Sequence, residues 1–453
     1  MNILSRRTFL ETSGKAAAIT ALAGLTRPAA RAQATKSPNE RPNVALIGCG
    51  GRGRFIIRVM VEEGGANCVA LCDLSDQRLE QCQKFLSEAQ EAKPRLEKDF
   101  RRVLDAKDID AVIIATPDVW HAPLTVMACQ AGKDVYVEKP HSHNIWESGK
   151  MVEAAKKYNK IVQVGTQNRS KEYNLAAREY LKSGKLGKIG LVKVFNLKSG
   201  NAFKLGDPGK QPEGFDWDRW IGPAPFRPFH EQIPFHGGWH AYWDFCGGDM
   251  CDDGIHQTDL ALMLMGDPGL PKNVRCVGGR YVHRGDDSEV PDVQVANWEF
   301  DSFVMTFELS AYPKYMVKSS DALRRKTLVP DWTQNATRIE LYGSELLMIV
   351  GRHGGGFVVE QSGSRIVEKM LGEAGDFEHY KNFLDCLKTR KQPNADISIA
   401  HASNVVAHMG NIAHRIGNTA LRYDAATGRF DNEKANAMIK PEYRKGYEIP
   451  DKV

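Results

Sequence analysis

The stretch NVALIGCGGRG, from Asn43 to Gly53, decides the fold. A short apolar run ends in glycines at positions 48, 50 and 53, which is G-x-G-x-x-G spacing, and a helical pattern follows at once. In such a strand–loop–helix unit, the first glycine permits a tight turn, the second lets the backbone approach a pyrophosphate, and the third allows close packing of helix on strand. The helix start adds unpaired N–H groups that can face an anion. We therefore predict a dinucleotide-binding loop made of Gly48, Cys49, Gly50, Gly51, Arg52 and Gly53.

Strand and helix patterns alternate from this loop to about residue 165. The apolar runs CVALCD, DAVIIAT, DVYVEK and IVQVGT are separated by amphipathic stretches such as SDQRLEQCQKFLSEAQ and NIWESGKMVEAAKKY. Apolar strands that alternate with such helices are typical of a parallel sheet covered on both faces. We predict an α/β chain with an N-terminal Rossmann domain, a doubly wound fold, over residues 40–166.

An acidic residue follows the second predicted strand. Asp73 lies 20 positions after Gly53. A carboxylate there accepts hydrogen bonds from ribose hydroxyls and repels a 2′-phosphate. The sequence thus favours NAD over NADP as the cofactor.

The chain changes character after Lys188. Seven strand-like runs, among them IGLVKVFNLKSG, VQVANWEFD and GFVVEQSG, are joined mostly by Gly and Asp turns. This pattern predicts an α+β domain over residues 167–417 with a large, mostly antiparallel open sheet. We expect one helix over residues 249–265 to interrupt it and two late helices to follow. Residues 418–453 are expected to form a C-terminal arm.

The first 32 residues have the features of a removable export signal. Arg6 and Arg7 precede an apolar run, AAAITALAGL, that is too short to span a bilayer comfortably, and Ala30-Arg31-Ala32 has the small-x-small form of a cleavage site. Paired arginines are typical of the twin-arginine version. We expect cleavage after Ala32 and a periplasmic or otherwise exported protein without membrane insertion.

Composition is that of a globular enzyme. The 453 residues are 42% hydrophobic and 26% charged, with a net charge of +5. The signal holds five Lys or Arg and one Glu, a net of +4, so the remainder is about +1. This balance argues against a nucleic-acid partner. The nine cysteines lack a C-x-x-C pair, so we expect buried free thiols and no metal site.

Two stretches carry candidate chemistry. VYVEKP places Glu138 and Lys139 after the fourth strand, where the carboxyl ends of parallel strands face the ligand crevice. GGDMCDDGIHQTD places Asp252 and His256 at i and i+4, one turn apart on the predicted helix, and Asp259 is an alternative partner for the histidine. Taken singly, a loop lysine is by default a surface residue, and a His–Asp pair on a helix is more often structural than catalytic.

Together these stretches resemble the glucose–fructose oxidoreductase / inositol dehydrogenase / MocA (Gfo/Idh/MocA) family. The resemblance rests on GCGGRG, ATPDVWHAP, EKP and DDGIHQTD, in that order, and extends over about residues 42–417. It implies that Lys139 lies by the reacting carbon, that His256 is the acid/base and that Asp252 is its neighbour. It also implies that the cofactor is flanked by Thr116, Pro117, His121, Glu138 and Lys139.

An aromatic segment lies between the two sets of motifs. It contains Trp217, Trp220, Trp239, His240, Tyr242 and Trp243. Such rings suit the C–H faces of sugars, but they equally suit a loop pinned to the body of the protein. Both readings stay open. The candidate substrate-binding residues are Gln167, Arg169, Lys198, Trp239, His240, Asp252 and His256.

These features predict an exported oxidoreductase that acts on a secondary alcohol of a sugar or glycoside. Free NAD is scarce outside the cytoplasm, and the twin-arginine route carries folded proteins, so we expect NAD to be loaded first, held tightly and recycled in place. One alternative is an NAD-assisted glycoside hydrolase, although a Y-x-T-H-x-x-G stretch that we associate with that branch is absent from the sequence. A second is a non-catalytic sugar-binding protein. We expect a homodimer or homotetramer.

Overall fold

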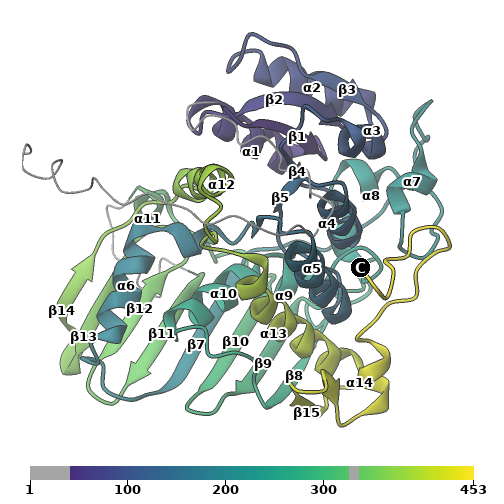
Figure 1. The fold of residues 1–453 in the computed structure, drawn as a ribbon. Helices are drawn as coiled ribbons and strands as arrows, with labels where there is room; N and C mark the ends of the chain where they lie inside the picture. Colours follow the sequence, from purple (N-terminus) through teal and green to yellow (C-terminus); the bar gives the residue numbers. More distant parts are fainter. Residues whose placement is uncertain (1–40, 326–335) are drawn as a thin grey trace, which may run out of the picture. The chain divides into compact units, whose positions relative to one another are not determined.

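Two β-sheets organise the chain in the computed structural model, which describes residues 41–325 and 336–453. The predicted signal peptide, residues 1–32, lies outside the described residues. Between them the sheets contain sixteen strands of the described chain (Figure 1). No helix within these two ranges is both long enough and apolar enough to cross a bilayer.

The first sheet is the predicted parallel Rossmann sheet. Its six strands run in the order β3-β2-β1-β4-β5-β6 and every neighbouring pair is parallel. The strands are β1 (Asn43–Ile47), β2 (Asn67–Cys72), β3 (Arg95–Glu97), β4 (Ala111–Ile114), β5 (Asp134–Val137) and β6 (Val162–Val164). Sequence patterns missed β3, because its three residues lie at the sheet edge and carry no apolar run.

Helices cover both faces of this sheet. One face packs against α1 (Gly51–Glu62), α2 (Asp76–Leu86) and α12 (Phe377–Thr389). The other packs against α3 (Phe100–Asp105), α4 (His121–Gln130) and α5 (Ile145–Lys157). Helix α12 comes from the late part of the chain (Figure 1). Its residues Tyr380 and Phe383 lie in the Rossmann core. The two sheets are therefore tied together by a long-range element.

The second sheet is large and mostly antiparallel, as predicted. Its order is β14-β13-β12-β11-β7-β10-β9-β8-β15-β16, and only the pair β7 and β10 is parallel within it. The strands are β7 (Ile189–Lys198), β8 (Asn273–Gly279), β9 (Val293–Glu299), β10 (Val304–Ala311), β11 (Arg338–Gly343), β12 (Leu347–Gly351), β13 (Phe357–Gln361), β14 (Arg365–Met370), β15 (Ala420–Asp424) and β16 (Arg429–Phe430).

One face of the second sheet is covered and the other is open. Helices α6 (Glu172–Lys182), α10 (Gly254–Leu264) and α13 (Ile397–Arg415) lie over the covered face (Figure 1). Side chains alternate along β8, where Val274 and Cys276 are buried beneath the helices while Val277 is 42% exposed. This alternation is the pattern of an open antiparallel sheet.

The chain end extends this sheet, which the sequence did not indicate. Strand β15 pairs with β8, and α14 (Glu433–Ala437) follows β16. The last residues then pack against α5, where the Tyr443 hydroxyl lies 2.6 Å from the Glu147 carboxylate.

The helix predicted over residues 249–265 is broken into two. Helix α9 (Gly248–Asp252) ends before Asp253, and α10 begins at Gly254. A Cβ at Gly254 would lie 2.5 Å from the Phe307 ring on β10, so a glycine is needed where the helix approaches the sheet. The remaining short helices are α7 (Trp217–Ile221), α8 (Gln232–Phe235) and α11 (Asp321–Arg324), and the 3₁₀ turns are η1 (Asp118–Trp120), η2 (Gln167–Ser170), η3 (Gly238–Ala241) and η4 (Ser362–Ser364).

Candidate active site

The glycine loop has the geometry expected from its spacing. Gly48 adopts φ +97°, and a Cβ there would meet the Ala115 carbonyl oxygen at 2.5 Å. A Cβ at Gly53 would lie 2.1 Å from the Gly48 carbonyl oxygen, so helix and strand meet closely at this point. By contrast, a Cβ at Gly50 or Gly51 would have no atom within 4 Å. The loop therefore presents bare backbone to open space at the start of α1, as an anion cradle requires.

Asp73 closes the far side of this loop. Its carboxylate accepts hydrogen bonds from the backbone N–H groups of Cys49, at 2.8 Å, and Ser75, at 2.9 Å. Burial raises the pKa of this carboxyl, and the positive charge of Arg78 opposes the shift. Asp73 thus both holds the glycine loop and faces the adjoining cavity.

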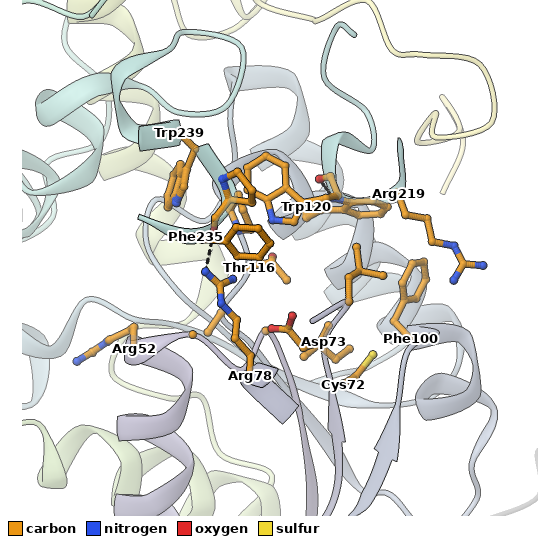
Figure 2. A pocket seen from close by; sticks show the side chains of 18 of the residues that line it. Arg52, Cys72, Asp73, Arg78, Phe100, Thr116, Trp120, Arg219, Phe235 and Trp239 are labelled. Carbon is orange, nitrogen blue, oxygen red and sulfur yellow. Dashed lines mark hydrogen bonds between the residues drawn. The ribbon is translucent and has the colours of Figure 1, made fainter. Parts of the chain in front are cut away.

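A cavity of about 380 Å³ runs from the glycine loop to the aromatic segment; we call it the cofactor cavity. Figure 2 shows Asp73 and Arg78 on one side and Phe235 and Trp239 on the other. Its lining also includes Gly48, Gly50, Gly51, Arg52, Phe100, Thr116, Pro117, Trp120, Arg219, Trp220 and His240.

The cofactor cavity fits a dinucleotide. Large apolar rings offer stacking surfaces, and the Gly50–Gly51 backbone offers N–H groups for a pyrophosphate. Thr116 lines the cavity, and its hydroxyl is buried without a hydrogen-bond partner in the described part of the chain. A buried hydroxyl of this kind calls for a ligand atom.

Lys139 lies at the junction of the two sheets. Its Nζ lies 2.7 Å from Asp252 Oδ1 and donates to the Asp252 backbone carbonyl at the same distance. Asp252 Oδ2 in turn lies 3.4 Å from His240 Nδ1, and the His240 ring stacks on Trp239. Burial opposes the charge of Asp252, but Lys139 and His240 outweigh it and hold the pKa of this carboxyl well below its usual range.

Lys139 keeps its charge. Burial disfavours the ammonium ion, yet Asp252 and Glu138 outweigh burial and raise the pKa of Lys139. A permanently charged donor therefore stands where the strands of the first sheet end.

His256 shares a second cavity with Lys139. This cavity of about 270 Å³, which we call the substrate pocket, is lined by Arg52, Lys139, Gln167, Asn168, Lys171, Tyr173, Asp253, His256, Lys318, Arg352, His353, Gly354, Ala374, Gly375 and Asp376. Burial and the positive charges of Arg352 and Lys139 lower the pKa of His256 well below its ordinary value. The imidazole is therefore neutral at neutral pH and can accept a proton.

The expected pairing of His256 with an aspartate on one helix is wrong. Because the helix breaks at Asp253, Asp252 turns to Lys139 and His240, as described above. The alternative partner, Asp259, is fully buried and receives both the Arg169 guanidinium and the Ser403 hydroxyl.

Two candidate sugar contacts are occupied by carboxylates. Arg169 is 3% exposed and pairs with Asp259 and Asp267, and it lines neither cavity. Lys198 Nζ lies 2.5 Å from Asp249 Oδ1 and also lines neither. Both side chains join elements of the second domain. The sequence did not reveal these partners, and contact of either side chain with a sugar stays a prediction.

Of the other predicted residues, Gln167, Trp239 and His240 line a cavity, whereas Glu138 and His121 line neither of the two. Gln167 lines the substrate pocket and donates to Tyr136 Oη at 3.2 Å, while Trp239 and His240 line the cofactor cavity instead. Glu138 pairs with Arg52 at 3.0 Å. His121 lies beneath the loops, with its ring nitrogens 2.7 Å from the Pro140 carbonyl oxygen and 2.9 Å from that of Thr116.

The structure supports the packing reading for part of the aromatic segment, while stacking on a sugar stays a prediction. Trp217 and Trp220 are 5% and 6% exposed and stack with centroids 5.0 Å apart, so Trp217 is a packing residue. Trp220, Trp239 and His240 also face the cofactor cavity. Trp243 lies outside both cavities and donates from its indole to the Glu289 carbonyl.

Several lining residues were not identified from the sequence. Arg78 and Phe100 lie in helices beside the glycine loop, and no motif marked them. Lys318 and Arg352 lie more than 170 residues after Lys139, and only the folded sheet brings them to it. Asp253 lies in the stretch DDGIHQTD, and its position next to Asp252 was the one sequence feature that could have identified it.

Known proteins share both parts of the fold. A glycosyl hydrolase family 109 protein of Saccharopolyspora erythraea is 30% identical over 172 residues, which are 34% of this chain and 38% of that relative. The match thus spans well under half of the relative's length. The fold is similar to that of aldose-aldose oxidoreductase from Caulobacter crescentus, complexed with glycerol, with a TM-score of 0.61 and 19% identity over 84% of this chain and 100% of that one.

A second solved structure has the same fold. It is levoglucosan dehydrogenase in complex with NADH and levoglucosan, with a TM-score of 0.60 and 17% identity over 84% of this chain and 99% of that one. Residues 42–166 match the NAD-binding Rossmann-fold domain of an oxidoreductase family, and residues 188–280 and 345–449 match the C-terminal alpha/beta domain of that family. These matches cover most of the chain, which therefore belongs to the GFO/IDH/MocA oxidoreductase family.

Proposed function

We propose that this protein is an NAD-dependent oxidoreductase that acts on a secondary alcohol of a sugar or glycoside. One observation carries the proposal: Lys139 of the first domain and His256 of the second line the same substrate pocket. Arg52 lines both this pocket and the cofactor cavity, so the two spaces adjoin. In Figure 2 the Arg52 side chain points away from Asp73 and Arg78.

The residues present support alcohol oxidation. NAD, when bound, supplies a hydride acceptor. Neutral His256 accepts the hydroxyl proton, which its lowered pKa permits because the ring is unprotonated before the reaction. The Lys139 ammonium stabilises the alkoxide character that develops on the substrate oxygen. Asp252 keeps Lys139 charged and holds its Nζ in place.

The segment from residue 199 to 247 favours tight retention of the cofactor. Several polar contacts join it to the Rossmann domain, and four of them involve Arg78, Lys98, Trp120 and Arg219. Arg78 donates to the Pro234 carbonyl at 2.5 Å, Lys98 to the Gly214 carbonyl at 3.1 Å, and Trp120 to the Trp220 carbonyl at 3.0 Å. Arg219 lies 3.3 Å from Asp99. Because this segment lines the cavity as well, release of a dinucleotide requires these contacts to open. Retention suits an enzyme that is exported and recycles its cofactor in place, as the N-terminal sequence predicts.

Cofactor choice follows from Asp73. Its carboxylate lines the cavity and would repel a 2′-phosphate, so we propose NAD and not NADP. The positive charge of Arg78 acts in the opposite direction. The preference for NAD is therefore expected to be moderate.

A glycoside hydrolase is the second candidate function. The similarity of residues in this chain to a glycosyl hydrolase family 109 protein favours it. A hydrolase that oxidises its substrate transiently would use the same lysine and histidine but would release a free sugar with no net change in bound cofactor. A non-catalytic sugar-binding role is disfavoured, because the chain places a charged donor, Lys139, and a base, His256, in one pocket.

Self-association is also proposed. The open face of the second sheet carries exposed apolar side chains, including Val277, Val304, Ile366 and Val367. An open sheet face with exposed apolar side chains of this kind suits a partner copy, as in a homodimer or homotetramer.

The test is to purify the exported protein and measure its bound nucleotide. Absorbance in the reduced-nicotinamide band is then followed while neutral and acidic sugars and glycosides are added. A sugar that reduces the bound cofactor supports an oxidoreductase, while release of free sugar from a glycoside without net reduction supports the hydrolase. Both are contradicted if no ligand reduces the cofactor of nucleotide-loaded protein and no glycoside is cleaved to a free sugar.

A further inference from the structure

The substrate pocket carries an excess of basic side chains. Its lining contains five of them, Arg52, Lys139, Lys171, Lys318 and Arg352, and two carboxylates, Asp253 and Asp376. Two of the cations have close carboxylate partners of their own. Lys139 pairs with Asp252 at 2.7 Å, and Arg52 pairs with Glu138 and Asp376 at 3.0 and 2.9 Å. These two belong to the cofactor side of the pocket.

The opposite wall is not balanced in this way. Lys318 and Arg352 share a single carboxylate oxygen, Asp253 Oδ1, at 2.5 and 3.3 Å. The Arg352 guanidinium has five N–H donors, and Asp253 is its one side-chain partner in the described residues. Lys171, the third basic residue here, lies 3.4 Å from Glu378, whose side chain is 55% exposed. We call Lys171, Lys318 and Arg352 the basic wall.

Two cations of the basic wall are largely buried, so the shortage of carboxylate partners around them is costly. The side chain of Arg352 is 9% exposed, and that of Lys171 is also 9% exposed. Cations removed from water are costly unless a negative group compensates them. Neighbouring groups are affected as well, because burial and the positive charges of Arg352, Arg324 and Lys318 lower the pKa of His353 to about 3.

We propose that the basic wall binds an anionic substituent, a carboxylate or a phosphate ester, carried by the same sugar whose hydroxyl reacts between Lys139 and His256. The proposal rests on the proposed function, because it assigns a substrate class to that site. The guanidinium fork of Arg352 matches the paired oxygens of either group. The cavity is only about 270 Å³, so the anion and the reacting hydroxyl must belong to one small ligand.

Binding of an anion also changes the base. Burial, Arg352, Lys139 and Lys318 all lower the pKa of His256. A bound carboxylate or phosphate offsets the charges of Arg352 and Lys318, so the pKa of His256 rises and the imidazole becomes a stronger base. A neutral sugar leaves the positive field in place. Recognition of the acidic substituent is thereby coupled to the chemical step.

The experiment compares matched ligands on the nucleotide-loaded protein. Glucose, galactose and mannose are each tested beside the corresponding uronate and 6-phosphate. Affinity is measured by calorimetry and hydride transfer by the reduced-nicotinamide band. At least one anionic sugar is expected to bind about 10-fold or more tightly than its neutral counterpart, which corresponds to about 1.4 kcal/mol, and to lose that advantage as salt is raised. Whether the uronate or the 6-phosphate responds identifies the anion.

Variants test the residues directly. Arg352→Gln and Lys318→Met are expected to remove most of the preference for the anionic sugar, whereas Arg352→Lys keeps part of it. Lys388→Met, at an exposed position on α12, is the matched control and should change nothing. If Arg352→Gln does not fold, the salt dependence of the wild-type protein and the Lys318→Met variant still decide the matter.

The proposed function and the proposed anion site can be disproved separately. If a neutral sugar reduces the cofactor as well as any anionic one does, the basic wall is not a recognition site, but the proposed function stands. If an anionic sugar binds through Arg352 but no ligand reduces the cofactor or is cleaved, the oxidoreductase proposal fails while the anion site stands. Absence of any preferential anion binding overturns the inference outright.

Discussion

The cofactor cavity and the substrate pocket are built in different ways. The cofactor cavity combines bare backbone at Gly50 and Gly51 with broad rings such as Trp120 and Phe235. The substrate pocket has a mostly polar lining with many charged side chains, among them Lys139, Asp253, Lys318 and Arg352. A cofactor of constant structure can be held by a local motif, whereas substrate selection depends on charges brought together by the fold. The two can therefore be changed separately.

The Lys139→Met variant is expected to slow hydride transfer without changing nucleotide binding. We expect the rate constant of hydride transfer to fall about 10³-fold, or about 4 kcal/mol, because the charged donor to the substrate oxygen is lost. The bound nucleotide content should be unchanged, because Lys139 does not line the cofactor cavity. Single-turnover absorbance measures the first quantity, and nucleotide extraction measures the second. A variant that transfers hydride at the wild-type rate would remove Lys139 from the mechanism.

Two tryptophans of the aromatic segment separate packing from binding. Trp217→Ala should lower the free energy of unfolding by about 3 kcal/mol, because the side chain is 5% exposed and stacked on Trp220. Trp239→Ala should cost less than about 1 kcal/mol of stability but weaken nucleotide retention, because this partly exposed ring lines the cofactor cavity. Chemical denaturation and nucleotide dissociation rates check the pair. Equal effects on both quantities would undo the distinction.

The Gly50→Ala variant is expected to weaken nucleotide binding only. The added methyl group meets no protein atom within 4 Å, so the fold should tolerate it, but it projects into the space where the loop faces the cavity. We expect nucleotide affinity to fall about 10-fold to 100-fold, or about 1.4 to 2.8 kcal/mol. Gly149→Ala, in helix α5 with equally open surroundings, is the control and should retain nucleotide. Full nucleotide retention in Gly50→Ala would show that the loop backbone is not a close contact.

Asp73→Asn should have the smallest effect. The amide retains an acceptor oxygen for a backbone N–H group but removes the charge that would repel a 2′-phosphate. The ratio of NADP to NAD affinity is expected to rise about 10-fold, or about 1.4 kcal/mol, with Arg78 nearby to assist. Competition binding to nucleotide-free protein measures it. An unchanged ratio would mean that Asp73 serves only to hold the glycine loop.

The sequence predicted the parts that are encoded locally. The G-x-G-x-x-G spacing, the alternation of strands and helices, and the antiparallel runs after residue 188 all gave elements that the structure contains. Four weak strands at or near the sheet edges were not predicted. Strands β3, β14 and β16 bury few apolar side chains, and β15 lies in a polar chain end. Periodicity detects burial, and these strands are held mainly by pairing with a neighbour.

At the site, the sequence could not show the long-range partners that decide a residue's surroundings. Arg169 looked available until the fold supplied Asp259 and Asp267, and Lys198 until it supplied Asp249. The helix through Asp252 looked continuous, since no pattern in DDGIHQTD shows that Gly254 must pack against Phe307. Lys318 and Arg352 carried no motif at all. Spacing along the chain identifies a loop or a helix face, but it does not identify what lies opposite.

The most direct test of the central claim is the absorbance of bound nicotinamide in the purified protein on mixing with the sugar panel, in wild type and in His256→Gln. The account predicts that at least one sugar reduces the bound cofactor in a single turnover of the wild-type protein, and that His256→Gln, with the same nucleotide content, does so far more slowly. Hydride transfer at equal rates in both proteins would contradict it, and so would a purified protein unable to hold a dinucleotide.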